Sequence, residues 1–197
     1  MDRVPNFNFL KLKASVGKNG NSAIPSYQWF GYYNVANNGY AGQTYRYPVI
    51  RENANLRWET STTYDIGMEY GFLGDRITGE LAWYRKQTND MLLNVTLQGS
   101  TGFGSWWDNV GSVYNTGVEF AIKSRNVVTD KFTWTTDFNI ARNYNEITSI
   151  GEYSPDAVSG GTNDTRVVVG MPIGTNYLVK FSHVDPQNGL PVYLDKE

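Results

Sequence analysis

Few residues in this chain can carry covalent or metal chemistry. Among its 197 residues there is no cysteine and one histidine, His183. The chain therefore offers no thiolate nucleophile, no disulfide, no CxxC zinc site and no metal site that needs two histidines. His183 is isolated beside Asp185, as a surface histidine is, and lacks the partners of a catalytic one. We expect no enzyme, no cofactor and no metal site here.

Carboxylates are more numerous, but they are distributed over separate segments. Six charged residues occupy the polar positions of segments that alternate with apolar residues: Asp65, Glu69, Glu80, Glu119, Lys123 and Asp137. Nothing in this distribution indicates the close carboxylate pair, one member with a raised pKa, that glycoside hydrolysis needs. We expect a solvated polar face. The alternative is that these groups line a substrate path or hold a domain placed against them.

Aromatic side chains gather in two of the longer connecting segments. We single out Trp29, Tyr32 and Tyr33 in one segment, and Phe103, Trp106 and Trp107 in the other. Rings on exposed loops can stack on the faces of sugars or pack against another protein. The alternative is that they pack on one another. We predict that this set includes the residues that contact a ligand or partner.

The composition excludes some functional classes and favours one fold class. A formal net charge of -2 lacks the basic surface of nucleic-acid-binding proteins. The chain is 40% hydrophobic, 15% aromatic and only 18% charged, and it has 20 glycines. This mixture is unusual for a helical enzyme and ordinary for an all-β protein. The length allows one domain, or two small ones.

Five segments alternate with period two, the pattern of strands with unlike faces. They lie near residues 8–17, 63–72, 76–88, 115–124 and 131–144, and a further strand is predicted after residue 166. Runs of roughly nine to eleven residues suit a tilted strand that crosses a bilayer.

The connections between these segments are of two kinds. Turns of a few residues alternate with long predicted loops at 18–62, 89–114 and 145–166. Short turns at one end and long extracellular loops at the other are typical of outer-membrane barrels. The sequence contains no signal-peptide core and no long apolar run for a transmembrane helix. We therefore predict an all-β, antiparallel transmembrane β-barrel segment.

Motifs follow one another along nearly the whole chain. They include LKLKASVG at 10–17, NLRWET at 55–60, YDIGMEYGF at 64–72, WYRKQTNDMLL at 83–93, NVGSVYNTGVE at 109–119 and NIARNYN at 139–145. In order and spacing this set resembles the SusC/RagA-like family of TonB-dependent outer-membrane transporters. The resemblance implies a barrel of roughly 22 strands, filled by a plug domain.

The same resemblance implies that the chain is a part of such a protein. At about ten residues a strand, 22 strands need about 220 residues before any loop is counted. We therefore expect residues 1–197 to be one partial barrel domain from the C-terminal half of the barrel, with the plug and signal peptide absent from it.

The implied function is import of oligosaccharide (glycan) or peptide nutrients across the outer membrane. The implied partners are a SusD-like surface lipoprotein, the TonB complex acting through the plug, and outer-membrane lipid, but no nucleic acid. The loop aromatics then contact the substrate or the lipoprotein. Two alternatives stay open from the sequence: a soluble all-β carbohydrate-binding sandwich, and a complete small outer-membrane barrel of about eight strands.

Overall fold

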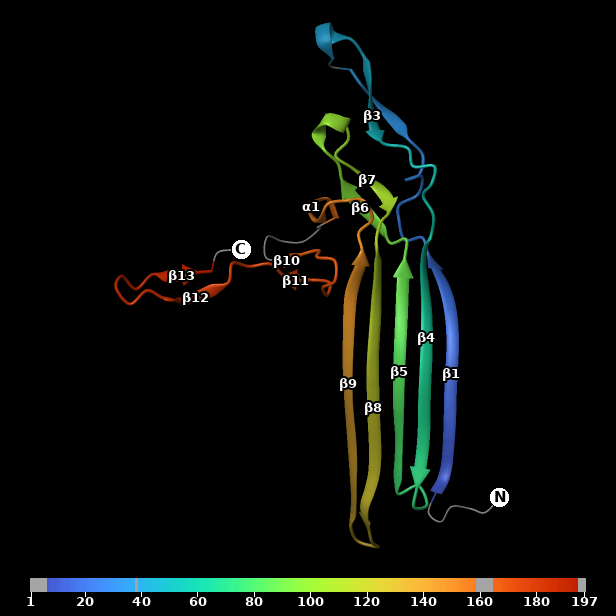
Figure 1. Ribbon diagram of the computed structural model, residues 1–197. Coiled ribbons are helices and arrows are strands. Elements are labelled where there is room, and N and C mark those ends of the chain that lie inside the picture. Colours follow the sequence, from blue (N-terminus) through green and yellow to red (C-terminus); the bar gives the residue numbers. More distant parts are fainter. Residues whose placement is uncertain (1–6, 38, 159–164, 195–197) are drawn as a thin grey trace.

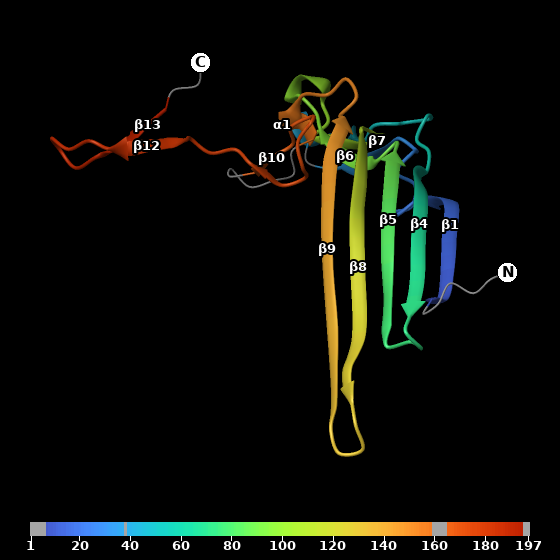
Figure 2. The same cartoon turned by 60° about the horizontal axis from the view of Figure 1, so that its bottom comes forward.

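The computed structural model of the chain describes residues 7–37, 39–158 and 165–194. Its main element is one antiparallel sheet of five long strands in the order β1-β4-β5-β8-β9 (Figure 1). The strands are β1 (Phe7–Asn21), β4 (Glu59–Phe72), β5 (Ile77–Asn89), β8 (Ser112–Val128) and β9 (Thr133–Ser149). The sheet is therefore an up-and-down meander. The shorter elements lie at one end of it, from which β12 and β13 extend sideways (Figure 2).

Each long strand overlaps one of the five predicted ranges and extends past it, mostly at the long-loop end. There the ladder continues between polar residues, as where Lys18 pairs with Thr62 and Gly20 with Thr60. On β1, β4 and the end of β5 both faces carry mainly polar residues and glycine at this level, so the alternation that marks a strand with unlike faces disappears there although the backbone pairing does not.

Two of the segments predicted as loops, 18–62 and 89–114, each contain a short antiparallel hairpin. The first hairpin pairs β2 (Tyr32–Ala36) with β3 (Tyr45–Ile50), and a 3₁₀ turn, Tyr40–Gly42, lies between them. The second pairs β6 (Leu92–Thr96) with β7 (Ser105–Asn109), with a 3₁₀ turn at Gly99–Thr101. Strands of five or six residues are too short for a clear period, so the sequence did not reveal them.

The C-terminal part differs from the strand predicted after residue 166. The described residues of this part, 150–158 and 165–194, form short elements: α1 (Pro155–Val158), β10 (Thr165–Arg166), β11 (Thr175–Asn176), β12 (Phe181–Val184) and β13 (Pro191–Tyr193). Prolines at 172, 186 and 191 lack a backbone donor, and glycines at 170, 174 and 189 adopt positive φ angles. These residues interrupt a ladder of spanning length.

The short connection between β4 and β5 is a tight turn. Leu73, Gly74 and Asp75 all have positive φ angles, at 53°, 66° and 60°. Asn8 of β1 accepts a hydrogen bond from the Gly74 N–H (2.9 Å) and donates one to Asp75 Oδ1 (3.0 Å). These bonds hold a left-handed backbone that is unfavourable for Leu73 and Asp75, and they connect the turn to the neighbouring strand.

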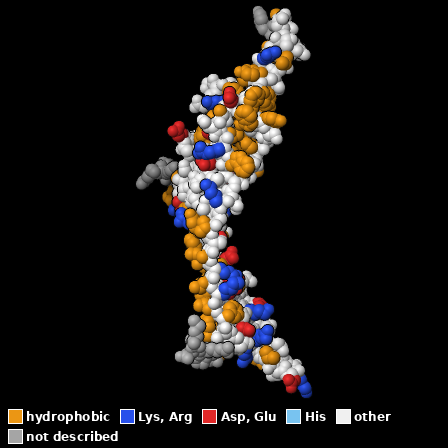
Figure 3. Space-filling model, turned by 90° about the vertical axis from the view of Figure 1, so that its right-hand side faces the viewer, with side chains coloured by type: hydrophobic (Ala, Val, Ile, Leu, Met, Phe, Trp, Pro, Cys, Tyr) orange, Lys and Arg blue, Asp and Glu red, His pale blue; other side chains and the backbone are white. Residues whose placement is uncertain are grey.

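The register gives the sheet two unlike faces, since residues paired across a ladder share one face. What we call the apolar face carries one row across all five strands: Leu12, Met68, Leu81, Phe120 and Ile140. What we call the polar face carries the adjacent row: Lys11, Glu69, Glu80, Ala121 and Asn139. Viewed along the sheet edge, hydrophobic side chains line one side of the strands and charged side chains the other (Figure 3).

Within the described residues the apolar face is not buried by a second layer. Leu12 is 73% exposed and Ile140 is 59% exposed. A β-sandwich buries this face against another sheet, so the soluble sandwich is the wrong architecture for this chain. The buried hydrophobic side chains of the described part lie at or above the loop end of the sheet: Val95, Val110, Val113 and Ile147. No helix of the described ranges is long and apolar enough to cross a bilayer.

Candidate functional site

The polar face carries ion pairs between neighbouring strands. Glu69 on β4 receives two lysines of β1: Lys11, whose Nζ lies 3.6 Å from Oε2, and Lys13, which donates to Oε1. The Lys13 Nζ also lies 3.9 Å from Oε1 of Glu80 on β5. Opposite charges on adjacent strands stabilise the pairing modestly, and they leave a charged, hydrated surface.

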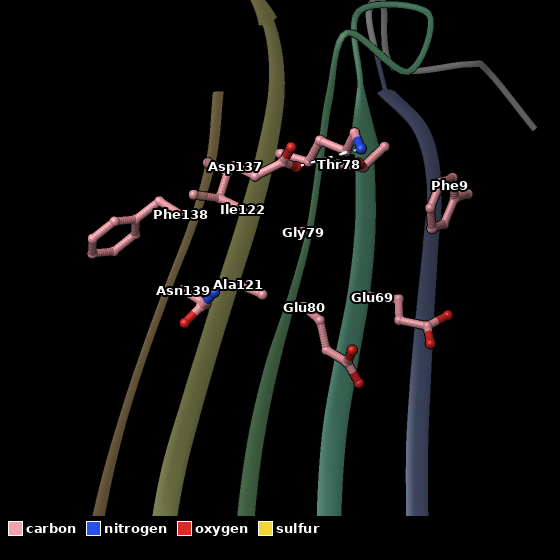
Figure 4. Close-up of a pocket in the computed structure, with 11 residues that line it drawn as sticks. Phe9, Glu69, Thr78, Gly79, Glu80, Ala121, Ile122, Asp137, Phe138 and Asn139 are labelled. Atoms are coloured by element: carbon pink, nitrogen blue, oxygen red, sulfur yellow. Dashed lines mark ion pairs between the residues drawn. The ribbon is translucent and has the colours of Figure 1, made fainter. Parts of the chain in front are cut away.

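A shallow hollow of about 350 Å³ lies on this side of the sheet (Figure 4). Glu69 and Glu80 lie side by side at one part of it, and the ion pair between Lys123 Nζ and Asp137 Oδ1 (3.4 Å) lies at another. Ala121 lies between these two groups and fills little of the space. The hollow is open, so it can contact another protein surface or a passing solute but does not enclose a ligand.

All six charged residues that the sequence placed at polar strand positions share the polar face, as the ladder partners show. The period-two prediction is confirmed for them. Asp65, for example, lies opposite Ser15, whose Oγ donates to Asp65 Oδ2 (3.1 Å). Within the described residues, five of the six form ion pairs or hydrogen bonds, all but Glu119, in keeping with a solvated face rather than a catalytic pair.

Beyond the loop end of the sheet, Asn53 joins two of the long connections. Its side chain is 6% exposed. Its Nδ2 donates to the carbonyl oxygen of Trp107 (3.0 Å) and to Asp108 Oδ1 (2.9 Å), and its backbone N–H donates to the carbonyl oxygen of Trp29 (3.0 Å). Its Oδ1 accepts from the Asn55 N–H (3.2 Å). An asparagine suits this position because one amide supplies two donors and an acceptor.

Trp106 on β7 makes two polar contacts in the same region, one with Tyr153 and one with Arg51. Its Nε1 donates to the hydroxyl of Tyr153 (3.1 Å), and that hydroxyl donates to Asp108 Oδ2 (2.7 Å). The guanidinium carbon of Arg51 lies 4.2 Å from the Trp106 ring centroid, which is a cation–π contact. Burial, and then the hydrogen bond to Asp108, raises the pKa of Tyr153 from 10.0 to about 12. We call the following five residues the loop cluster: Arg51, Asn53, Trp106, Asp108 and Tyr153.

A second set of bonds connects the loop cluster to the sheet. Arg57 Nη2 donates a hydrogen bond to Asp90 Oδ1 (2.7 Å), and this bond raises the pKa of the guanidinium above its ordinary value. Asn109 bridges the two residues: its Oδ1 accepts from the Arg57 N–H (2.7 Å), and its Nδ2 donates to the carbonyl oxygens of Arg57 (2.7 Å) and Asp90 (2.9 Å). The loops are thereby fixed to the entry of β4 and the end of β5.

The structure divides the predicted contact residues into an exposed and a packed group. Trp29, Tyr32 and Tyr33 are 52%, 40% and 66% exposed. Phe103, Trp106 and Trp107 are half-buried in or beside the second hairpin. In the described part of the chain, Trp29 and Trp107 are linked through Asn53. Trp106 supports the loop cluster, so its ring is less available for a ligand than the first three.

Sequence reasoning did not single out Asn53, Asp108 or Tyr153. Their bonds join residues far apart in the chain, as between Asn53 and Trp107, which periodicity does not detect. One signal is local. Asn53 lies two residues before the NLRWET motif and Asn55 is its first residue, just ahead of the strand, and asparagine side chains commonly fix turns.

Comparison with known families places the chain. The family model described as "TonB dependent receptor-like, beta-barrel" matches residues 5–189. The chain belongs to this family. It is 39% identical over 188 residues to TonB-dependent receptor P26 of Formosa agariphila, covering 92% of the chain and 19% of that receptor. It is 35% identical over 200 residues to TonB-dependent receptor SusC of Bacteroides thetaiotaomicron, covering 93% of the chain and 20% of SusC.

Solved structures of this family have the same fold. The structure of the RagAB peptide transporter matches with a TM-score of 0.81 at 26% identity, over 97% of this chain and 21% of that one. The RagAB peptide importer in its open-open state matches with a TM-score of 0.82 at 26% identity, over the same shares. The chain thus spans about a fifth of the length of its relatives. The predicted family and the antiparallel barrel-type fold are confirmed.

Proposed function

We propose that this chain is a section of the barrel wall and outer loops of a TonB-dependent outer-membrane importer of nutrients. The observation that carries the proposal is a single-layered sheet with an exposed apolar face on one side and a charged face on the other. In water an exposed apolar face of this size is unfavourable. In a membrane barrel the apolar face contacts lipid and the polar face lines the lumen.

The height of the apolar face agrees with that placement. On β9 the face runs from Trp134 near the short turn to Tyr144 near the loop end. These ten steps span about 34 Å of strand, or about 26 Å along the membrane normal at a tilt near 40°. An apolar band of about 25 Å, bounded by aromatic residues, is what a membrane barrel presents to lipid. The long loops then lie outside the cell.

The proposed cargo is an oligosaccharide or a peptide, delivered by a SusD-like surface lipoprotein. The likeness to SusC and to the RagAB peptide transporter supports this class of cargo and a two-protein assembly. We assign the energy input to the TonB complex, acting through a plug domain of the full-length protein. The exposed rings of Trp29, Tyr32 and Tyr33, with Phe103, are the proposed contacts, and Trp106 and Trp107 support them from the adjacent hairpin.

The test compares strains of the host bacterium that carry or lack the gene of the full-length protein, and that carry or lack TonB. Uptake of fluorescently labelled peptides and oligosaccharides is measured for each strain. We expect uptake of one cargo class to require both the gene and TonB. A Trp29→Ala/Tyr33→Ala variant should lower uptake and lipoprotein binding, whereas Tyr193→Ala, an exposed ring outside the proposed set, should not.

Uptake that persists without the gene, or without TonB, would overturn the proposed import. Unchanged uptake and lipoprotein binding in the Trp29→Ala/Tyr33→Ala variant would remove only the contact assignment. A second readout tests the placement: the full-length protein should be extracted from the outer-membrane fraction by detergent and not by salt.

A further inference from the structure

The apolar face carries two arginines, both toward its loop end. Arg85 of β5 shares the face with Leu81, and Arg142 of β9 shares it with Ile140, because each is an even number of residues away along its strand. In the rows from Ile77 to Leu81, toward the short turns, no charged side chain of the five strands lies on this face. Lys18 of β1 lies on the same face one row further toward the loops, in the row of Glu146. The positive charge of the face is therefore confined to its loop-end part.

Glu146 is the one acidic residue of this face within the five described strands. Its Oε2 accepts hydrogen bonds from the hydroxyls of Tyr114 (2.7 Å) and Tyr144 (3.2 Å). Arg85 contacts the same group from the other side, with its guanidinium carbon 4.6 Å from the Tyr114 ring centroid. The tyrosines hold Glu146 in place and position Arg85 by a cation–π contact, but neither arginine forms an ion pair with this carboxylate.

Arg142 has no hydrogen-bond or ion-pair partner among the residues that the structure describes. It is exposed, and it lines a shallow hollow of about 290 Å³ together with Trp83, Thr116, Val118 and Tyr144. Trp83, Val118 and Arg142 share the row nearer the middle of the face, and Thr116 and Tyr144 share the next row toward the loops. An arginine beside an apolar hollow needs an anion, because an unpaired charge on a lipid-facing surface is unfavourable.

The two arginines can serve one anion. They are separated by β8 alone, which is about 10 Å across two strand spacings, and they differ by one row, about 7 Å along the strands. Long arginine side chains keep their stems on apolar surface and extend their charged ends toward the headgroup level. A guanidinium matches a phosphate group through two parallel hydrogen bonds.

We infer that Arg85 and Arg142 bind the phosphate group of an anionic lipid of the outer leaflet, with its acyl chains against Trp83 and Val118. The charge of the pair fits the phosphate, and the apolar side of the hollow fits the chains, which a free phosphate ion lacks. This inference rests on the proposed membrane placement and adds a lipid site to the proposed importer.

The test is native mass spectrometry of the detergent-purified full-length protein with three probes: phosphatidic acid, diacylglycerol and inorganic phosphate. We expect phosphatidic acid to bind, diacylglycerol with the same chains to bind much more weakly, and excess inorganic phosphate not to displace the lipid. Arg85→Gln/Arg142→Gln should lose about tenfold or more in affinity for phosphatidic acid, the effect of losing charge-assisted hydrogen bonds. Arg85→Lys/Arg142→Lys should bind with intermediate affinity, because lysine keeps the positive charge but cannot form the two parallel hydrogen bonds.

Lys86→Gln is the matched control, because it removes the same charge at the next position but on the polar face. Folding of every variant is checked by its heat-modifiable migration, and the single variant Arg142→Gln replaces the double one if the latter misfolds. Equal lipid binding by the wild type and the arginine variant, an equal loss in Lys86→Gln, or displacement by inorganic phosphate would overturn the inference. If the folded wild type imports cargo but does not bind phosphatidic acid, the lipid site alone is refuted and the proposed import stands.

Discussion

At the scale of single residues, the hydroxyl of Tyr153 joins two loop segments. It accepts from Trp106 Nε1 and donates to Asp108 Oδ2, and only the neutral phenol can do both. Burial and the bond to Asp108 raise its pKa from 10.0 to about 12. Ionisation therefore removes a donor and places a second negative charge beside Asp108, which couples the loop cluster to alkaline pH.

We predict that the loop cluster loosens as the pH rises from about 10 to 12. In this window the unfolded phenol releases its proton while the folded one retains it, so stability falls with pH, by at most about 2–3 kcal/mol. Hydrogen exchange of residues 104–110, measured at several pH values, reports the loosening. Tyr153→Phe should exchange faster at pH 8 and lose most of this pH dependence, and Tyr47→Phe, outside the cluster, should behave as the wild type. A Tyr153→Phe profile that still parallels the wild type would contradict the assignment.

At the scale of one element, β5 separates two environments along a single strand. Leu81 lies on the apolar face, opposite Met68 and Phe120, and the next residue, Ala82, lies on the polar face, opposite Gly67 and Glu119. The two positions share the same level of the membrane in the proposed placement. They therefore form a matched pair for asking which face contacts lipid.

We predict that Leu81→Arg impairs folding of the full-length barrel and that Ala82→Arg does not. An arginine on the lipid face near mid-membrane costs about 2–4 kcal/mol, whereas an arginine at position 82 reaches water and the carboxylate of Glu119 on the neighbouring strand. The measurement is the heat-modifiable, protease-resistant fraction of each variant in lipid vesicles. Equal folding of both variants, or the reverse order, would be inconsistent with the placement.

The strands and the loops differ in how far the sequence could predict them. Alternation identified all five long strands because each has unlike faces, as in Phe132 to Ile140. It missed both hairpins and the loop cluster, since those depend on bonds between distant residues such as Asn53 and Asp108. The gathering of aromatic residues in the loops, not alternation, led to the prediction of Trp106 as a contact residue, and in the structure its indole nitrogen donates to the Tyr153 hydroxyl. Residue type selected the candidate loops, which remain a prediction, and the tertiary arrangement adds which of their rings are packed and which are exposed.

At the scale of the whole molecule, the sheet and its loops act as two connected parts. The sheet offers an apolar and a polar face, and the loops above it are fixed by Arg57, Asp90 and Asn109. The exposed rings of Trp29 and Tyr33 therefore extend from an ordered base rather than from free loops. An ordered base lowers the entropy cost of binding a partner, so changes in the base should alter binding without altering the barrel.

We predict that Asn53→Ala weakens binding of the proposed lipoprotein partner while the full-length barrel keeps its fold. The substitution removes the two hydrogen bonds to Trp107 and Asp108 and leaves both acceptors half-buried, at a local cost of about 1–3 kcal/mol. Hydrogen exchange should become faster around residues 29 and 104–110 and not in β4 or β5. The affinity for the lipoprotein, measured by surface plasmon resonance, should fall mainly through faster dissociation. Asn55→Ala is the control, because Asn55 contributes only its backbone N–H to this network. If Asn53→Ala loosens the loops but lipoprotein binding is unchanged, the ordered base is structural and does not serve the partner. If hydrogen exchange instead becomes faster throughout the strands, Asn53 stabilises the barrel, and the division into two parts is wrong.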